Sequence, residues 1–375
     1  MTRPLRIGVV CFPSLGGSSV VASELALGLA GRGHEVHLMA SARPARAHQR
    51  EGLTFHRVHV PGYPLLEHSP YGLALASLIV EVTRAHALDL VHVHYAVPHA
   101  SSALLARQVL GPHAPRLVTS LHGTDVAPLG ADPSYRTVTA HAVAVSDRII
   151  VPSAYLRDQA HTRLGLPADV PVEIIPNFVD TDHFAPAAEP RVRSASASVN
   201  LFHVSNLRPV KRAVDLVEVL AQVRRHLDAH LTIVGDGPDR GAVEARAAAL
   251  GAARHVHFLG KRADFVDELR RADAFVLPSE VESFGVAALE ALSAGVPVFA
   301  YRVGGLPEVV VDGVGRLVEP YDTGALARAI VESVSAPAAH AAMGRAARAH
   351  VLGRYRREPA IDRYLATFHR VLELA

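Results

Sequence analysis

The chain has 375 residues, more than one hydrophobic core usually serves, so we expect two domains. Hydrophobic residues make up 49% and charged residues 20%, and the net charge of +2 provides no strong basic field for binding nucleic acid. The single cysteine, Cys11, excludes an intramolecular disulfide and a cysteine-based zinc site, and it favours a cytoplasmic location.

Two apolar segments are too short for targeting or membrane insertion. The run after the basic N-terminus has about six residues before Pro13, so we interpret it as a first buried strand rather than a signal peptide. Residues 71–82 carry Glu81 and are too few to span a bilayer. We therefore expect no stable membrane anchor.

Short β-branched segments alternate with longer Ala- and Leu-rich amphipathic segments in the first half of the chain. The alternation predicts βαβ units and a parallel sheet, with a first helix within residues 16–34. The expected strands are residues 6–12, 35–40, 55–60, 90–95, 116–122, 148–153 and 172–177.

A Pro- and Ala-rich segment without periodicity, residues 181–199, is predicted to be a linker. The alternation then restarts, which predicts a second α/β domain at 200–352 after a first at 1–180. The cleft between two such doubly wound domains is the default binding site. An amphipathic helix at 353–375 would pack on its own domain or cross back to the first. The second set of expected strands is residues 200–206, 231–237, 255–260, 274–279 and 296–301.

The segment 279–298 is mostly small and apolar, yet it keeps Glu282 and Glu290. The helical pattern begins near Phe284 and Gly285, so Glu282 precedes the helix and Glu290 lies within it. The helix N-terminus between them favours an anion, and the eight-residue offset spans on the order of 10 Å. A nucleotide sugar, with a diol on each side of a diphosphate, suits this spacing. The alternative is that both are solvated helix glutamates.

Three other loops after expected strands carry residues suited to a phosphate-bearing ligand. Gly16 and Gly17 let a backbone approach a phosphate closely, although a plain turn explains them equally well. Lys211, one of only two lysines, is a compact cation for a diphosphate, or else part of a solvated basic turn. His122 ends a strand beside Gly123 and is placed to meet a ligand.

Other common site motifs are absent from the sequence. It has neither the G-x-S-x-G of serine hydrolases nor a P-loop. His92 and His94 in "HVHY" share a strand face, but we identify no Asp, Glu or Cys partner for them. We therefore predict no metal site there.

Together these segments resemble the retaining glycosyltransferases of the family-4 type. Glu282 and Glu290 in "ESFGVAALE" match the E-x7-E signature of that family, and residues 295–320 match the segment next to that signature. The Gly-Gly loop and Lys211 match as well, and the resemblance covers nearly the whole chain. It implies a two-domain GT-B architecture, with the acceptor site in the first half and the nucleotide-sugar site in the second. It also implies that the C-terminal helix crosses back to the first domain.

A closer resemblance is to members that glycosylate L-malate in the first step of bacillithiol synthesis. It is carried by "HVHYAVPHA", "SLHGTDVAPLGADPSY" and "SNLRPVKR". It implies UDP-N-acetylglucosamine as the donor and L-malate as the acceptor. We expect no required cofactor, and a divalent cation is not implied, because no D-x-D motif lies at a strand end near the proposed site. The alternatives are another acceptor, such as inositol phosphate or a lipid-linked glycan, a UDP-N-acetylglucosamine 2-epimerase of GT-B shape, and a non-catalytic binding protein. Oligomeric state is left open.

The resemblance also implies roles for individual residues. Glu290 holds the ribose diol, Glu282 contacts the donor hexose, and Arg262 meets the uracil. Many members have an arginine five residues before the lysine, where this chain has Asn206, and Arg208 could supply the missing charge. The resemblance implies a donor-binding set of Gly16, Gly17, Asn206, Arg208, Lys211, Arg262, Glu282, Ser283, Phe284, Gly285 and Glu290. It implies an acceptor-binding set of Ser18, Tyr95, Thr119, His122 and Arg136, in which Arg136 is favoured for a malate carboxylate. The implied catalytic residues are Lys211, Glu282 and His122.

Overall fold

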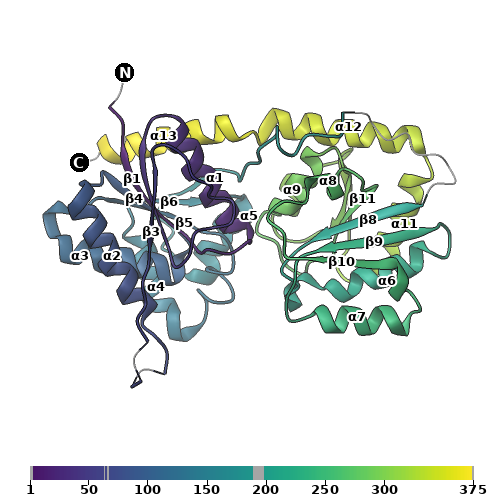
Figure 1. Ribbon diagram of the computed structural model, residues 1–375, viewed down its shortest axis with the longest axis horizontal. Helices are drawn as coiled ribbons and strands as arrows, with labels where there is room; N and C mark the ends of the chain where they lie inside the picture. Colours follow the sequence, from purple (N-terminus) through teal and green to yellow (C-terminus); the bar gives the residue numbers. More distant parts are fainter. Residues whose placement is uncertain (1–2, 63, 66, 189–197, 374–375) are drawn as a thin grey trace. The chain divides into compact units, whose positions relative to one another are not determined.

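The chain forms two compact units in the computed structural model, which describes residues 3–62, 64–65, 67–188 and 198–373. The first unit comprises Met1–Asn177 and Arg357–Ala375, and the second comprises Phe178–Arg356. Each is built around one parallel sheet with helices packed on it (Figure 1). The predicted fold class, two successive doubly wound α/β sheets, is therefore confirmed.

The first unit holds a seven-stranded sheet in the order β3-β2-β1-β4-β5-β6-β7, and all its neighbours are parallel. Its strands are β1 Arg6–Val10, β2 Glu35–Ala40, β3 Leu53–Arg57, β4 Leu90–His94, β5 Arg116–Ser120, β6 Arg148–Val151 and β7 Val172–Ile174. Its α-helices are α1 Gly17–Gly31, α2 Tyr71–His86, α3 Ser101–Leu110, α4 Pro133–Ala144, α5 Ala154–Gln159 and α13 Arg357–Glu373.

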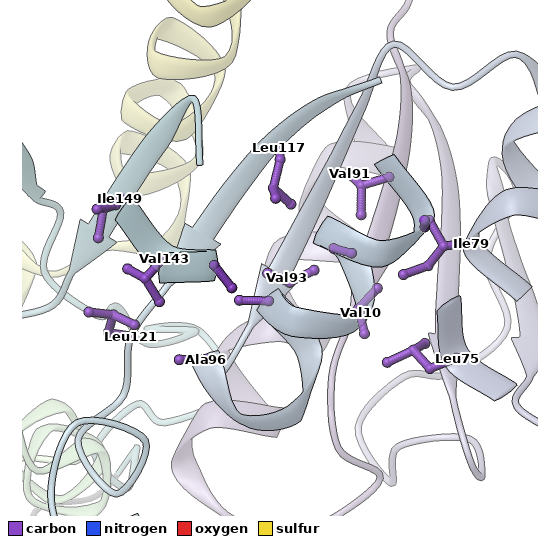
Figure 2. Packing of buried hydrophobic residues seen from close by; sticks show 14 of the residues in the cluster. Val10, Leu75, Ile79, Val91, Val93, Ala96, Leu117, Leu121, Val143 and Ile149 are labelled. Carbon is purple, nitrogen blue, oxygen red and sulfur yellow. The ribbon is translucent and has the colours of Figure 1, made fainter. Parts of the chain in front are cut away.

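One face of this sheet packs against α2, α3 and α4. Apolar side chains fill this layer, and most of them are β-branched residues from strands or leucines and alanines from helices, as expected for a parallel sheet covered on both faces. Figure 2 shows part of this cluster, with Val10, Val91, Val93, Leu117 and Ile149 from the strands and Leu75, Ile79 and Val143 from the helices.

The opposite face packs against α1 and α13. His92 points to this side, because it alternates with Val91 and Val93 along β4, and its ring contacts Tyr364 and Phe368 of α13. The final helix thus belongs to the first unit, although it follows the second in sequence (Figure 1). It begins at Arg357, later than the predicted start at 353, because the preceding helix α12 continues to Arg354.

The second unit holds a six-stranded sheet in the order β10-β9-β8-β11-β12-β13, and it is also parallel throughout. Its strands are β8 Val199–Val204, β9 Ala229–Val234, β10 Val256–Gly260, β11 Ala274–Leu277, β12 Val298–Tyr301 and β13 Gly315–Val318. Its α-helices are α6 Ala213–Val223, α7 Arg240–Ala249, α8 Val266–Leu269, α9 Val286–Ser293, α10 Leu306–Val309, α11 Thr323–Val334 and α12 Pro337–Arg354.

The predicted linker at 181–199 falls partly on residues 189–197, which lie outside the described residues. Its first part belongs to the second unit, where Phe184 is buried and contacts Phe265. No helix within the described ranges combines the length and the apolar character that crossing a membrane requires.

In each unit the first strand along the chain is a central strand of the sheet, and the later strands are added on both sides of it. β1 lies between β2 and β4, and β8 lies between β9 and β11. The loops after such a pair of strands diverge to opposite faces, and α/β proteins bind ligands in the crevice beyond their carboxyl ends. The expected site loops follow β1 and β4 in the first unit, and β8 and β11 in the second.

Candidate functional site

Two loops of the second unit meet beyond the carboxyl ends of β8 and β11. Lys211 lies in a 3-10 turn, Pro209–Lys211, after β8, and Glu282 lies in the loop between β11 and α9. The Lys211 ammonium Nζ lies 2.5 Å from Glu282 Oε1, and both side chains are largely shielded from solvent. The backbone N–H of Glu280 donates to Val210 O at 2.8 Å and joins the same two loops.

The Glu282 carboxylate and its backbone are both held in place. Ser279 Oγ donates to Glu282 Oε1 at 2.9 Å, and Gly305 N donates to Glu282 O at 2.9 Å. Gly304 has φ +55°, and a Cβ added there would lie 1.9 Å from Glu282 O. Only glycine fits this approach, so the Gly304–Gly305 turn supports the Glu282 loop directly.

The helix after Glu282 begins where the sequence predicts. Gly285, with φ +94°, is the N-cap of α9, and Phe284 before it is buried against Tyr355. Glu282 precedes α9 and Glu290 lies within it, as predicted. Glu290 is only 4% exposed, so the alternative of two solvated helix glutamates is wrong. A carboxylate is buried in an apolar helix only where polar groups meet it, so Glu290 has a fixed position within α9.

The Lys211 loop is also fixed by contacts of the next residue, Arg212. Arg212 has φ +48° and forms a bidentate ion pair with Asp215, at 2.8 and 2.9 Å. The Tyr301 hydroxyl donates to Asp215 Oδ2 at 2.8 Å, and the Arg212 guanidinium lies 4.5 Å from the centre of the Tyr321 ring. The strained backbone at Arg212 is therefore compensated by charge-assisted contacts.

A buried histidine supports the turn between β8 and Lys211. His203 Nε2 lies 2.7 Å from Ser205 Oγ, and its Nδ1 lies 2.8 Å from Val276 O. Burial lowers the pKa of His203 to about 4, and the nearby Lys211 cation also disfavours a second positive charge. His203 is therefore neutral at physiological pH and joins β8 to β11 beneath the Lys211–Glu282 pair.

The remaining predicted donor residues of the second unit lie around these loops. Asn206 and Arg208 are exposed in the turn after β8, and Ser283 is half-buried between Glu282 and Phe284. Arg262, after β10, is exposed, and its guanidinium lies 2.5 Å from the Glu268 carboxylate.

In the first unit, Gly16, Gly17 and Ser18 form the start of α1. Gly16 is the N-cap, and no side chain caps this end of the helix. Ser14 Oγ lies 2.9 Å from Ser19 Oγ and accepts a hydrogen bond from Gly16 N, so these contacts hold the loop before α1 in place. α1 has 15 residues, and the free N–H groups at its N-terminus lie next to two glycines, whose lack of a side chain lets an anion approach.

Tyr95 and His122 lie next to each other beyond the carboxyl ends of β4 and β5. Their rings are nearly parallel, with centres 6.2 Å apart, and Phe12 packs edge-on against Tyr95 at 5.1 Å. Tyr95 has φ +96°, which is strained for a residue with a side chain, and its N–H donates to Ser120 O. Such strain is common where a loop is held for binding.

A residue not singled out in the sequence, Asp125, connects these loops. It is fully buried, and its carboxylate accepts from the backbone N–H groups of Ala96, His122 and Gly123 at 2.7–2.9 Å. Burial raises the pKa of Asp125, and the three donated hydrogen bonds oppose that rise. The signal in the sequence is the spacing H-G-T-D, in which an Asp reaches back to N–H groups two and three residues earlier.

Thr119 and Arg136 differ in accessibility. Thr119 is fully buried in β5, and its hydroxyl lies 2.8 Å from Ser146 Oγ, so a substrate would touch it only if the interior opened. Arg136 is exposed in the first turn of α4, and its guanidinium lies against Gly165. Of the predicted acceptor residues, Arg136 thus carries an accessible positive charge that suits a carboxylate.

Family models match both halves of the chain. Residues 190–350 match the model of "Glycosyl transferases group 1", and residues 15–183 match that of "Glycosyltransferase Family 4". These ranges contain the two sets of loops described above.

Named relatives extend over most of the chain. It is 37% identical over 374 residues to N-acetyl-alpha-D-glucosaminyl L-malate synthase of Bacillus anthracis, covering 98% of this chain and 97% of that protein. It is 30% identical over 373 residues to D-inositol 3-phosphate glycosyltransferase of Saccharomonospora viridis, covering 89% and 85%.

Solved structures share the fold at lower identity. Sucrose-phosphate synthase from Thermosynechococcus elongatus has a TM-score of 0.82 at 21% identity, with 99% of this chain and 100% of that one covered. Anabaena HepE in complex with UDP and glucose has a TM-score of 0.81 at 20% identity, with 97% and 99% covered. The chain belongs to the family-4 glycosyltransferases of the GT-B fold and is a hexosyltransferase.

Proposed function

We propose that this glycosyltransferase moves N-acetylglucosamine from UDP-N-acetylglucosamine to the hydroxyl of L-malate, with retention at the anomeric carbon. The observation that carries the proposal is the Lys211–Glu282 pair at the switch point of the second sheet, next to the N-terminus of α9. The 37% identity to a protein named as an L-malate synthase of this kind supports the choice of substrates. The single, buried Cys11 suits the cytoplasmic location that we propose for the reaction.

The second unit would bind the donor. Lys211 and the first N–H groups of α9 would neutralise the diphosphate, and Glu290 would accept hydrogen bonds from the ribose diol. Glu282 would orient the hexose through its hydroxyls. Arg262 would meet the uracil. These groups supply the charge that a diphosphate requires, so we propose that transfer needs no divalent cation or other cofactor.

The first unit would bind the acceptor. The exposed Arg136 guanidinium is the group we assign to one malate carboxylate, with Ser18 and Tyr95 as neutral partners. His122 has its pKa lowered to about 3 by burial, with His99 contributing, so it is uncharged at neutral pH. A neutral imidazole can hydrogen-bond either a carboxylate or a sugar hydroxyl without the cost of burying a charge.

The chemical step is a front-face displacement. The C1–O bond to the diphosphate breaks while the malate oxygen forms a new bond to C1 on the same face. The malate hydroxyl proton passes to the departing β-phosphate oxygen, so UDP leaves with that proton and no protein base is consumed. Catalysis then depends on positioning and on stabilising the charge that grows on the diphosphate, which is the role of Lys211.

Product analysis tests the proposal against its alternatives. The full-length chain is incubated with UDP-N-acetylglucosamine and L-malate, inositol phosphate or no acceptor, and the products are identified by mass spectrometry. We expect a malate glycoside in the first reaction and no product in the other two. A product with inositol phosphate alone would replace L-malate as the acceptor. Turnover of the donor to an isomer without an acceptor would favour an epimerase.

A further inference from the structure

Three histidines of the first unit converge outside the loops of the candidate site. His37 lies in β2, His56 in β3, and His86 is the last residue of α2. One ring nitrogen from each lies within 4.8 Å of the corresponding nitrogens of the other two. Neutral imidazole is the commonest protein ligand of transition-metal ions, so this cluster has the chemistry of a metal site.

Strand register explains why the histidines meet. His37 is paired with Thr54 in the neighbouring strand, so His56, two residues further along, points to the same face of the sheet. α2 covers this face and ends at His86, whose ring lies 4.1 Å from that of His37. Three separate elements thus deliver one imidazole each to one position.

The contacts within the cluster leave suitable lone pairs. His37 Nδ1 lies 2.9 Å from His56 Nε2, and His37 Nε2 lies 3.0 Å from Glu35 Oε1. A hydrogen bond to the Glu35 carboxylate places the His37 proton on Nε2 and leaves a lone pair on Nδ1. His56 offers its Nε2 to the same ion when its own proton is on Nδ1. A carboxylate that orients a ligating histidine in this way is the usual outer partner of a metal-bound imidazole.

The spacing is close to that of a bound ion. Two nitrogens at the zinc–nitrogen distance in a tetrahedral site are roughly 3.3 Å apart, so His37 Nδ1 and His56 Nε2 need to separate by only about 0.4 Å. His37 is 1% exposed, whereas His56 and His86 are half-buried. The cluster therefore has an interior side and a solvent side, and a water molecule could complete the coordination.

A second group of potential ligands, in the second unit, shows what distinguishes the first. Asp228, His230 and His255 also lie within 4.8 Å of one another. There, however, Arg224 donates to the Asp228 carboxylate at 2.9 Å, and Arg254 Nε donates to His255 Nε2 at 3.0 Å. Each guanidinium binds one acceptor atom of this group, and the two positive charges repel a cation. The charged group in contact with the first cluster is instead the Glu35 carboxylate.

We propose that His37, His56 and His86 bind one Zn²⁺-type divalent ion, with Glu35 orienting His37. The ion joins β3, the edge strand of the sheet, to β2 and to the C-terminal end of α2. Its role is structural: it fastens an edge strand and takes no part in glycosyl transfer. Glu35 and His37 occupy the first half of β2, whereas the candidate site residues follow the last residues of their strands.

Cobalt(II) is the probe, because its visible absorption bands report coordination by nitrogen ligands in a four-coordinate geometry. The full chain is stripped with a chelator and titrated with Co²⁺, followed by displacement with Zn²⁺, and its thermal midpoint is measured with and without Zn²⁺. We expect one Co²⁺ per chain with intense bands and a higher midpoint with Zn²⁺. His56→Ala and His86→Ala should each weaken binding at least about tenfold, and Glu35→Ala by about 10- to 100-fold.

Two matched variants control for other histidines. His255→Ala removes a ligand from the second group, and His141→Ala removes an exposed histidine of α4; both should bind Co²⁺ as the unmodified chain does. Absence of binding to the unmodified chain, retention of full affinity in both His56→Ala and His86→Ala, or loss of binding in His255→Ala would each overturn the proposal. The test is independent of the glycosyltransferase assay, and removing the ion should leave transfer from the donor unchanged.

Discussion

Lys211 Nζ and Glu282 Oε1 lie 2.5 Å apart, although the two residues are 71 positions apart in the sequence. They follow β8 and β11, which are neighbours in the sheet, so their contact is set by the topology of the second unit. The pair is partly shielded, with 19% of the lysine and 12% of the glutamate side chain exposed. Before a ligand binds, the Lys211 ammonium is paired with Glu282 and is not a bare buried charge. A diphosphate that binds here would compete with the Glu282 carboxylate for this ammonium.

Replacing Lys211 tests its role on the leaving group. Lys211→Ala removes a cation aimed at the developing diphosphate charge, so kcat should fall by about 10²- to 10³-fold while the fold persists. The substitution also leaves Glu282 unpaired, so Lys211→Ala/Glu282→Gln should restore stability but not turnover. Steady-state kinetics with circular dichroism measure both effects. Lys261→Ala, the other lysine, should retain activity; near-normal turnover of Lys211→Ala would exclude the assignment.

Gly304 allows a direct test of the Glu282 loop. A Cβ at Gly304 would lie 1.9 Å from Glu282 O, so Gly304→Ala should displace Glu282 and raise the KM for UDP-N-acetylglucosamine by at least about tenfold. Gly313→Ala is the matched control, because Gly313 also has a positive φ, +86°, but nothing lies within 4 Å of its added Cβ. Both variants carry a backbone cost of about 1–2 kcal/mol, so only the difference between them reports the contact. Equal KM values in the two variants would show that the Gly304 approach does not position Glu282.

Arg136 is the test of the acceptor assignment. Losing a charge-assisted contact to a carboxylate costs about 1.5–3 kcal/mol, so Arg136→Ala should raise the KM for L-malate by roughly 10- to 150-fold and leave the KM for the donor unchanged. The exposed Arg84 of α2 provides a control, Arg84→Ala, with the same loss of charge from the first unit. An unchanged KM for malate in Arg136→Ala would remove this residue from the acceptor site.

Most of the fold could be predicted because the strand segments are apolar and bounded by turns. Most of the predicted strands overran at their carboxyl ends, however: the strand predicted at 231–237 ends at Val234 as β9, where Gly235 turns with φ +119°. Ligand-binding loops begin at these ends, and periodicity alone does not reveal the last residue of the strand. The edge strand β13 was not predicted; it has four residues, and Arg316 within it is exposed.

The candidate site was predictable only where local pattern carries the information. The order of loop, helix N-terminus and helix around Glu282 and Glu290 follows from capping and period signals, and the structure confirms it. The contact of Gly304 with the Glu282 backbone, and the bond from the Ala96 N–H to Asp125, could not be predicted, because tertiary packing brings these groups together. The direct roles of the predicted residues in donor and acceptor binding stay predictions.

Three buried histidines, His92, His94 and His99, together with the partly buried His122, give the first unit a specific dependence on pH. They lie around the carboxyl ends of β4 and β5, where His94 Nδ1 is 3.1 Å from His122 Nε2 and His92 Nε2 is 2.8 Å from Ser120 Oγ. Burial lowers the pKa of His92 and His122 to about 3 and that of His99 to about 4, and it lowers that of His94 as well. The folded state therefore holds all four neutral.

The direction of the effect is set by proton linkage. In the unfolded chain these histidines take up protons below their ordinary pKa of 6.5, while in the folded state they do not until the pH approaches 4 or 3. Between these limits the unfolded state binds more protons, so the free energy of unfolding falls as pH falls, by up to about 1.4 kcal/mol per pH unit for each histidine. Asp125 acts in the opposite direction, because its pKa is raised on folding.

We therefore expect the first unit to lose stability steeply below about pH 6, before the second unit does. Hydrogen exchange at the amides of β4 and β5, compared with those of β8 and β11, measures the two units separately over the range from about pH 7.5 to about pH 5. His99→Gln removes one of the four titrating groups and should make the pH dependence of the first unit shallower by up to one proton, whereas His141→Gln, on the exposed side of α4, should leave it unchanged. A first unit whose stability does not change between these pH values would mean that the histidines are accessible to protons in the folded state, and His122 would then carry a charge where the acceptor is proposed to bind.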